Sequence, residues 1–265
     1  MKVLGVELPL TLVRRLRALK QLRYTVMDLA IRAGLKRGGK EHYQPFVVVS
    51  RSRTGSTLID YSLRLHPEVE MDGEILNRLL GRREEQVLLN YFSNKPSNVK
   101  AAGFKIFYYH PLDGSPEFVF SLLHGMKNCK YIHLTRENKL AVHLSRSVVE
   151  QTQAWSTKKD TPRVIAPLIT VDPEACQEDF ERTQVWENKF REAFADREVY
   201  HITYEDLVQE PVAALTRIQR FLGVTPLQIA PPTKKQQRGS IASRIANYSE
   251  LQDHFANTQW ANLFK

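Results

Sequence analysis

The chain has 265 residues and lacks any apolar run long enough to span a membrane, any internal repeat and any low-complexity tract. It has two cysteines, Cys129 and Cys176, which is too few for a disulfide framework or a cysteine-based metal site. These absences exclude repeat proteins and disulfide-stapled domains, and they make a reducing, cytoplasmic setting the default expectation. Since 42% of the residues are apolar, the length is sufficient for one sizeable core.

The most informative feature is a predicted strand that leads into a hydroxyl-rich loop. Residues 46–50 form an apolar, β-branched run, and helical spacing of apolar residues resumes at Leu58. The first turn of a helix presents unpaired N–H groups to an anion, and a glycine allows close backbone approach. The predicted phosphate-binding residues are Arg51, Ser52, Arg53, Thr54, Gly55, Ser56 and Thr57. The loop lacks the first glycine and the lysine of the ATP-binding P-loop, which argues against magnesium–ATP chemistry.

This loop resembles the 5′-phosphosulfate loop of sulfotransferases, which use 3′-phosphoadenosine 5′-phosphosulfate (PAPS). Three further segments occur in the order of that family. In the second, Arg136 follows a strand and Ser145 lies on the next helix, and the resemblance implies that both hold the 3′-phosphate. Ser147 is the competitor for the serine role, because one helical residue corresponds to about 100° of rotation.

The third segment, 199–211, is similar to the strand exit at which the family places a tyrosine toward adenine, here Tyr204. The fourth is the basic tail containing Lys235, Arg238 and Gly239, which matches the late clamp on the phosphates of the nucleotide. Each segment alone is more simply a helix cap, a surface arginine, a core aromatic or a solvated loop. Their ordered combination is what identifies the chain as a member of the family.

Predicted strands at 46–50, 100–107, 130–135 and 199–203 alternate with helical stretches, one of which is expected over 137–155. The fold class is therefore α/β, and the resemblance implies a P-loop-like three-layer sandwich with a mostly parallel sheet. A helix is expected from Pro211 to Phe221, with Gly223 as its stop signal. We expect a helical extension over 1–43 and a catalytic domain over 44–265.

Sulfuryl transfer needs fixed cations and a base, as phosphoryl transfer does. The resemblance implies that Arg53 stabilises the bridging oxygen, and Lys105 is the candidate for the sulfuryl oxygens. For the base we choose Glu74, in the position where bacterial carbohydrate sulfotransferases place a glutamate. His110 is the rival base and Asp72 a weaker third choice. No metal cluster is visible in the sequence, and the chemistry requires none.

The net charge is uneven: residues 1–40 carry +8 and the remainder +1. A basic amphipathic helix in this region would either lie on an anionic membrane surface or pack on the domain or on a second subunit, and both readings stay open. The nearly neutral remainder argues against a nucleic-acid partner. Glu7 and Pro9 interrupt the short apolar run, which argues against a signal peptide.

The resemblance is strongest to nodulation-factor and trehalose sulfotransferases, which sulfate sugar hydroxyls, so a carbohydrate or glycolipid acceptor is expected. Residues 76–98 and 156–185 are predicted to shape its pocket, and Trp155 and Trp186 are either stacking platforms or core residues. Three alternatives remain: a P-loop-like kinase, a hydrolase, which would need a G-x-S-x-G that the loop does not fit, and a non-catalytic membrane-surface protein.

Overall fold

The computed structural model describes residues 2–3, 6–7, 42–93, 95–152, 168–231 and 240–264. A central sheet has the strand order β4-β5-β3-β6-β7, and all of its neighbouring strands are parallel. Its strands are β3 (Gln44–Ser50), β4 (Val69–Asp72), β5 (Ala101–Phe107), β6 (Lys130–Thr135) and β7 (Val199–Thr203). The predicted α/β class with a parallel sheet is confirmed.

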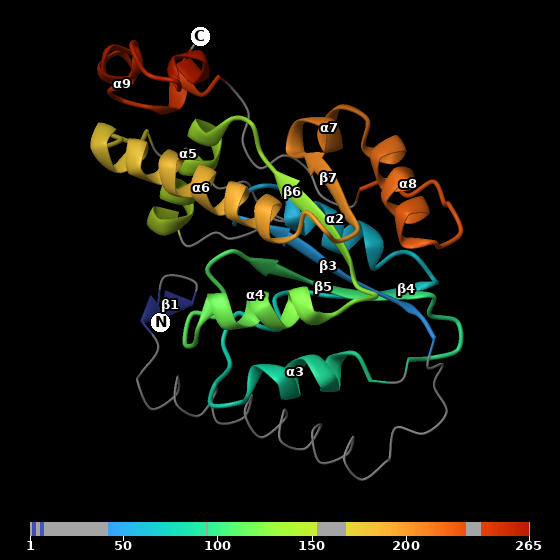
Figure 1. The fold of residues 1–265 in the computed structure, drawn as a ribbon. Coiled ribbons are helices and arrows are strands. Elements are labelled where there is room, and N and C mark those ends of the chain that lie inside the picture. Colours follow the sequence, from blue (N-terminus) through green and yellow to red (C-terminus); the bar gives the residue numbers. More distant parts are fainter. Residues whose placement is uncertain are drawn as a thin grey trace.

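Helices cover both faces of this sheet (Figure 1). They are α2 (Ser56–Leu63), α3 (Glu84–Tyr91), α4 (Pro116–Gly125), α5 (Lys139–Thr152), α6 (Pro173–Ala193), α7 (Tyr204–Gln209), α8 (Pro211–Leu222) and α9 (Tyr248–Phe255). Two short 3₁₀ helices, η1 (Ala242–Arg244) and η2 (Ala261–Phe264), lie near the C-terminus, and β1 (Lys2–Val3) pairs antiparallel with β2 (Val6–Glu7). None of the helices in these described ranges is both long and apolar enough to cross a membrane.

Alternate side chains of β3 build the two halves of the core. Val48 packs with α2, α7 and α8, while Val47 and Val49 face α3, α4 and the end of α6. Figure 1 shows the same division, with α2, α7 and α8 on one side of the sheet and α3 and α4 on the other. A third apolar cluster joins α5, α6 and α9 beside the sheet. A strand buried on both faces reads as a continuous apolar run, which explains why residues 46–50 signalled a strand so clearly.

The predicted elements agree with the observed ones to within a few residues. The helix expected over 137–155 begins two residues later, because the side chain of Asn138 accepts a hydrogen bond from the N–H of Ala141 (2.8 Å) and caps the helix. Helix α8 begins at Pro211, and Gly223 follows it in a left-handed conformation (φ 75°), as predicted. Strand β4 was not predicted, since Val69–Asp72 has only four residues and two of them are acidic.

The carboxyl ends of the parallel strands meet along one edge of the sheet, and the order reverses around β3. Open α/β sheets bind ligands at such a switch point. The phosphate loop follows β3, Arg136 follows β6 and Tyr204 follows β7. The fold therefore gathers at one edge residues that are far apart in the sequence, from Arg51 to Tyr204.

Candidate functional site

The loop between β3 and α2 turns sharply into the helix. Arg53 (φ 70°) and Gly55 (φ 95°) both adopt left-handed backbone conformations, which an arginine rarely does. Gly55 is the N-cap of α2, and among the described residues no side chain caps this helix. The N–H of Leu58 donates to the carbonyl of Gly55 (2.8 Å), and among the described residues the N–H groups before it are left for another acceptor, as expected of an anion site.

The ring of Tyr204 lies directly against this loop. A Cβ atom added to Gly55 would meet the ring carbon Cδ2 of Tyr204 at 2.5 Å, so only glycine fits here. The guanidinium carbon of Arg136 lies 4.2 Å from the centroid of the same ring. Arg136 also donates to the backbone carbonyl of Arg53 (3.1 Å). The loops that follow β3, β6 and β7 therefore form one connected surface.

Arg53 and Arg136 place two cations close together in a partly buried position. Burial lowers the pKa of Arg53, and the charge of Arg136 acts in the same direction. Burial also lowers the pKa of Arg136, against the opposing effects of Tyr204 and Glu205. Both groups stay protonated at neutral pH. Two desolvated guanidinium groups side by side are an environment that an anion would stabilise.

Arg136 has unused hydrogen-bonding capacity. Its Nε is buried and has no hydrogen-bond partner among the described residues, and the Oε1 of Glu205 lies 4.0 Å from it. A buried donor without an acceptor is unfavourable, so it indicates a ligand that supplies one. The residues present thus fit the phosphate groups of a nucleotide.

The structure also separates the two candidate serines. The Nε of Arg53 donates to the hydroxyl of Ser145 at 2.9 Å, whereas the hydroxyl of Ser147 donates to the carbonyl of His143 one turn earlier in α5. Ser145 therefore lies on the loop side of the helix. Ser147 has its hydroxyl engaged by the helix itself.

Other members of the loop serve its own structure. The guanidinium of Arg51 is 1% exposed and donates to Asp179 and Thr183, so its charge already has a partner. The hydroxyl of Thr54 donates to the carbonyl of Arg51 (2.7 Å) and closes the turn. Burial raises the pKa of Tyr109, and the neighbouring side chain of Ser52 opposes this shift. The side chain of Arg51 therefore belongs to a buried ion pair, and we do not propose it as a phosphate ligand.

A second group of predicted residues meets beside α2. The ammonium of Lys105 lies 3.3 Å from the hydroxyl of Thr57, 3.4 Å from Oε1 of Glu74 and 3.7 Å from Oδ2 of Asp60. The carbonyl of Gly73 accepts from the N–H of Lys105 (3.1 Å), which fixes Glu74 beside strand β5. A cation, a hydroxyl and a carboxylate are thus in contact at the edge of the loop.

The imidazole of His110 lies near the carboxylate of Glu74. Its Nδ1 accepts a hydrogen bond from the N–H of Phe107 (3.3 Å), which assigns the proton to Nε2, 4.0 Å from Oε2 of Glu74. Burial lowers the pKa of His110 to about 4, and Lys105 acts in the same direction. His110 is therefore neutral, with its N–H rather than a lone pair toward Glu74. Asn77 donates to the same oxygen of Glu74 (3.0 Å).

The family comparison agrees with this geometry. The sulfotransferase family model matches residues 45–228, more than half of the chain. The chain belongs to the sulfotransferase family. It is 27% identical to nodulation protein H of Rhizobium meliloti (strain 1021) over 84% of this chain and 95% of that protein. It is also 27% identical to nodulation protein H of Rhizobium tropici, covering 84% and 93%.

Among solved structures, mouse sulfotransferase SULT7A1 complexed with PAP is 14% identical, with a TM-score of 0.46 over 85% of this chain and 87% of that chain.

Some of the predicted residues of the present chain lie outside the described residues. They are Lys235, Arg238, Gly239 and Trp155, together with most of the predicted N-terminal helix. Asp72, the third candidate base, is half exposed, and Arg64 lies 3.9 Å from it.

Sequence reasoning missed three buried acids, Asp60, Asp179 and Glu187. Asp60 accepts from Arg64 (2.5 Å) in the helix after the loop. Asp179 lies on the buried face of α6 with Cys176, Thr183, Glu187 and Phe190. The sequence carries no clear signal for them, because α6 has exposed acids as well as buried ones and the cationic partner of Asp179 in the loop is 128 residues away.

Proposed function

We propose that this sulfotransferase moves a sulfuryl group from PAPS to a hydroxyl of a carbohydrate or glycolipid acceptor by direct in-line transfer. One observation carries this proposal: the loop after β3, Arg136 and Tyr204 form one connected surface, and the buried Nε of Arg136 has no hydrogen-bond partner in the part of the chain that the structure describes. Family membership supports sulfuryl transfer, and the resemblance of the motifs to sulfotransferases that sulfate sugar hydroxyls supports the acceptor class.

In this proposal the nucleotide lies along the edge of the sheet. The N–H groups at the start of α2, together with Ser56 and Thr57, receive the 5′-phosphosulfate. Arg136 and Ser145 receive the 3′-phosphate, and Tyr204 packs against the adenine side. The residues of the basic tail, Lys235, Arg238 and Gly239, complete the phosphate contacts.

Transfer breaks the bond between sulfur and the bridging oxygen and forms one between sulfur and the acceptor oxygen. Negative charge grows on the leaving phosphate, where Arg53 is the nearest loop cation, and Lys105 stabilises the sulfuryl oxygens. Glu74 takes the proton of the acceptor hydroxyl. Because His110 presents an N–H to Glu74, we assign it to positioning that carboxylate instead of to proton abstraction.

The test is calorimetric titration of 3′-phosphoadenosine 5′-phosphate (PAP) into wild type, Arg136→Ala and Glu74→Gln, with transfer of labelled sulfate from PAPS to a panel of oligosaccharides. We expect Arg136→Ala to weaken PAP binding at least tenfold and Arg83→Ala, an exposed arginine, to leave it unchanged. Glu74→Gln should keep PAP affinity but lower kcat by roughly 10²–10⁴-fold. The matched control is Glu117→Gln, a surface carboxylate on α4.

Absence of PAP binding by the wild type would refute the donor assignment. Full transfer activity in Glu74→Gln would instead refute the assignment of the base, and His110→Gln would then be the next variant to assay.

A further inference from the structure

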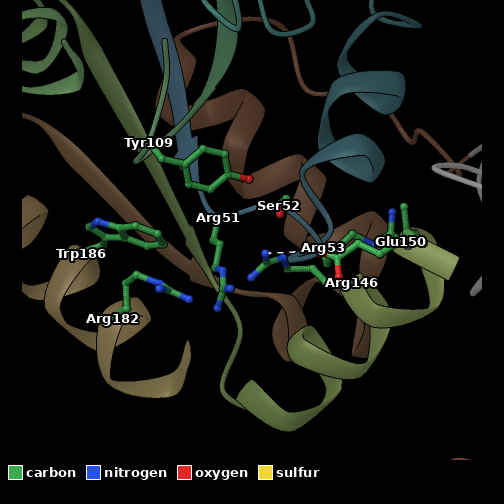
Figure 2. Close-up of a pocket in the computed structure, with 9 residues that line it drawn as sticks. Arg51, Ser52, Arg53, Tyr109, Arg146, Glu150, Arg182 and Trp186 are labelled. Carbon is green, nitrogen blue, oxygen red and sulfur yellow. Dashed lines mark ion pairs between the residues drawn. The ribbon is translucent and has the colours of Figure 1, made fainter. Parts of the chain in front are cut away.

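A cavity of about 480 Å³ opens beside the phosphate loop (Figure 2). Its wall combines arginines from three parts of the chain with an aromatic surface. The lining residues are Arg51, Ser52, Arg53, Tyr109, Arg146, Val149, Glu150, Arg182 and Trp186. Arg53 belongs both to this cavity and to the loop, so the cavity lies next to the position at which we place the transferred group. Arg136, Gly55 and Tyr204 do not line it, so the cavity adjoins the proposed nucleotide surface at the loop without including these three residues.

Charge in this wall is unbalanced. Arg51, Arg146 and Arg182 all donate to the same oxygen, Oδ1 of Asp179. The donor nitrogens of Arg146 and Arg182 lie 2.8 and 3.1 Å from that oxygen, so they are at most 5.9 Å apart. The other oxygen of Asp179 contacts His143 (3.0 Å). The carboxylate of Asp179 therefore accepts hydrogen bonds from three guanidinium groups.

Glu150 offsets part of this charge, with its carboxylate 3.6 Å from Arg146. Among the described residues, Arg51, Arg146 and Arg182 still outnumber the two carboxylates that contact them, Asp179 and Glu150. Arg51 is fully buried, but the side chains of Arg146 and Arg182 are 34% and 50% exposed at the wall. A buried pair needs one arginine, and the two additional guanidinium groups have planar forks that match a phosphate or carboxylate.

The aromatic side of the cavity has a complementary chemistry. The ring of Trp186 lies with its centroid 5.6 Å from that of Tyr109, and the guanidinium carbons of Arg51 and Arg182 lie 5.9 and 5.8 Å from the Trp186 ring centroid. The indole therefore supports the arginines while it offers apolar surface to a ligand. A flat apolar face beside cationic donors suits a sugar ring that bears an anionic group.

We propose that the acceptor is an anionic sugar, whose phosphate or carboxylate is bound by Arg146 and Arg182 while its ring packs on Trp186. This rests on the proposed function, because the cavity is taken as the acceptor side of a sulfuryl-transfer site. The charge then determines specificity: with a neutral sugar Arg146 and Arg182 continue to share one oxygen of Asp179 with Arg51, whereas an anionic sugar adds a further acceptor for them.

The experiment uses protein saturated with PAP, so that the donor anion sites are filled. Glucose 6-phosphate, glucuronate and glucose are titrated into wild type, Arg182→Gln and the control Arg217→Gln, whose side chain on α8 is 44% exposed and lies outside this cavity. We expect at least one of the two anionic sugars to bind wild type and the control at least tenfold more tightly than glucose, and Arg182→Gln to lose most of that difference. Comparison of the two anionic probes distinguishes a phosphate site from a carboxylate site.

Equal affinity for all three probes, or no binding of either anionic sugar to the PAP-saturated protein, would overturn the proposal. An Arg182→Gln variant that retains the preference would overturn it as well. Failure of the proposed function is separable, because it appears in the preceding titration as wild-type protein that PAP does not saturate.

Discussion

Asp179 provides the sharpest test of how the arginine-rich wall is held together. Its side chain is 2% exposed and accepts hydrogen bonds from Arg51, Arg146, Arg182 and His143. Asp179→Asn preserves the shape of the side chain but removes its charge. The variant leaves the buried guanidinium of Arg51 without a counter-ion and brings the other cations into mutual repulsion.

The magnitude follows from burial. Removing one partner of a buried ion pair costs about 3–5 kcal/mol, because the remaining charge is left desolvated. The pairs with Arg146 and Arg182 are partly exposed and add little. Since the asparagine oxygen still accepts hydrogen bonds, we expect a loss of stability at the low end of this range, about 3 kcal/mol. For a chain of this size the corresponding decrease in Tm is about 6–12 °C.

Differential scanning calorimetry at neutral pH measures this decrease, and Glu181→Gln, an exposed acid on the same helix, is the matched control. Burial by itself raises the pKa of Asp179, but hydrogen bonds from His143 and Arg51 outweigh this effect and hold that pKa well below its ordinary range. Its stabilisation is therefore complete above the unfolded pKa of about 4 and is lost as pH falls below it. Asp179→Asn should lack this component of acid sensitivity. A Tm within about 2 °C of the control would refute the reasoning.

Three further predictions concern the loop and the positioning histidine. Gly55→Ala should abolish PAP binding and lower Tm, because its methyl group would meet a tyrosine ring at 2.5 Å; Gly125→Ala, with open space around it, is the control. Ser145→Ala should weaken PAP binding in calorimetry, whereas Ser147→Ala should not. Burial lowers the pKa of His110 to about 4 from 6.5, so native stability should fall as pH decreases between these values, and urea unfolding of His110→Gln should show a smaller decrease.

The arrangement of the loop, Arg136 and Tyr204 at the ends of neighbouring strands could be predicted from the sequence, because the signals are local. Residues 46–50 and the following loop are contiguous, and the parallel sheet carries each strand end to the same edge. Gly55 was expected to permit close approach of an anion, and the structure adds that the ring of Tyr204 already occupies the space beside it. The edge strand β4 escaped prediction, since four residues of mixed character carry too little periodicity.

Side-chain roles were less predictable where they depend on partners far along the chain. Arg51 and Arg53 are two positions apart in the same loop, yet Arg51 is drawn into the interior by Asp179, 128 residues away. The sequence left Trp186 open between a stacking platform and a core residue; the structure packs it partly buried against the core and places it in the wall of the cavity.

The sequence by itself therefore determined the parallel α/β fold, the strand–loop–helix unit around residues 46–58 and the family, since each rests on short patterns of backbone preference and hydrophobic burial. Only the tertiary structure decided which charges are neutralised in the interior and which face the cavity. Asp179 and Glu74 show the reason: an ion pair forms between atoms a few ångströms apart, whatever their separation in the chain. Packing of α5 and α6 beside the loop fixed that proximity, and with it the cationic character of the cavity.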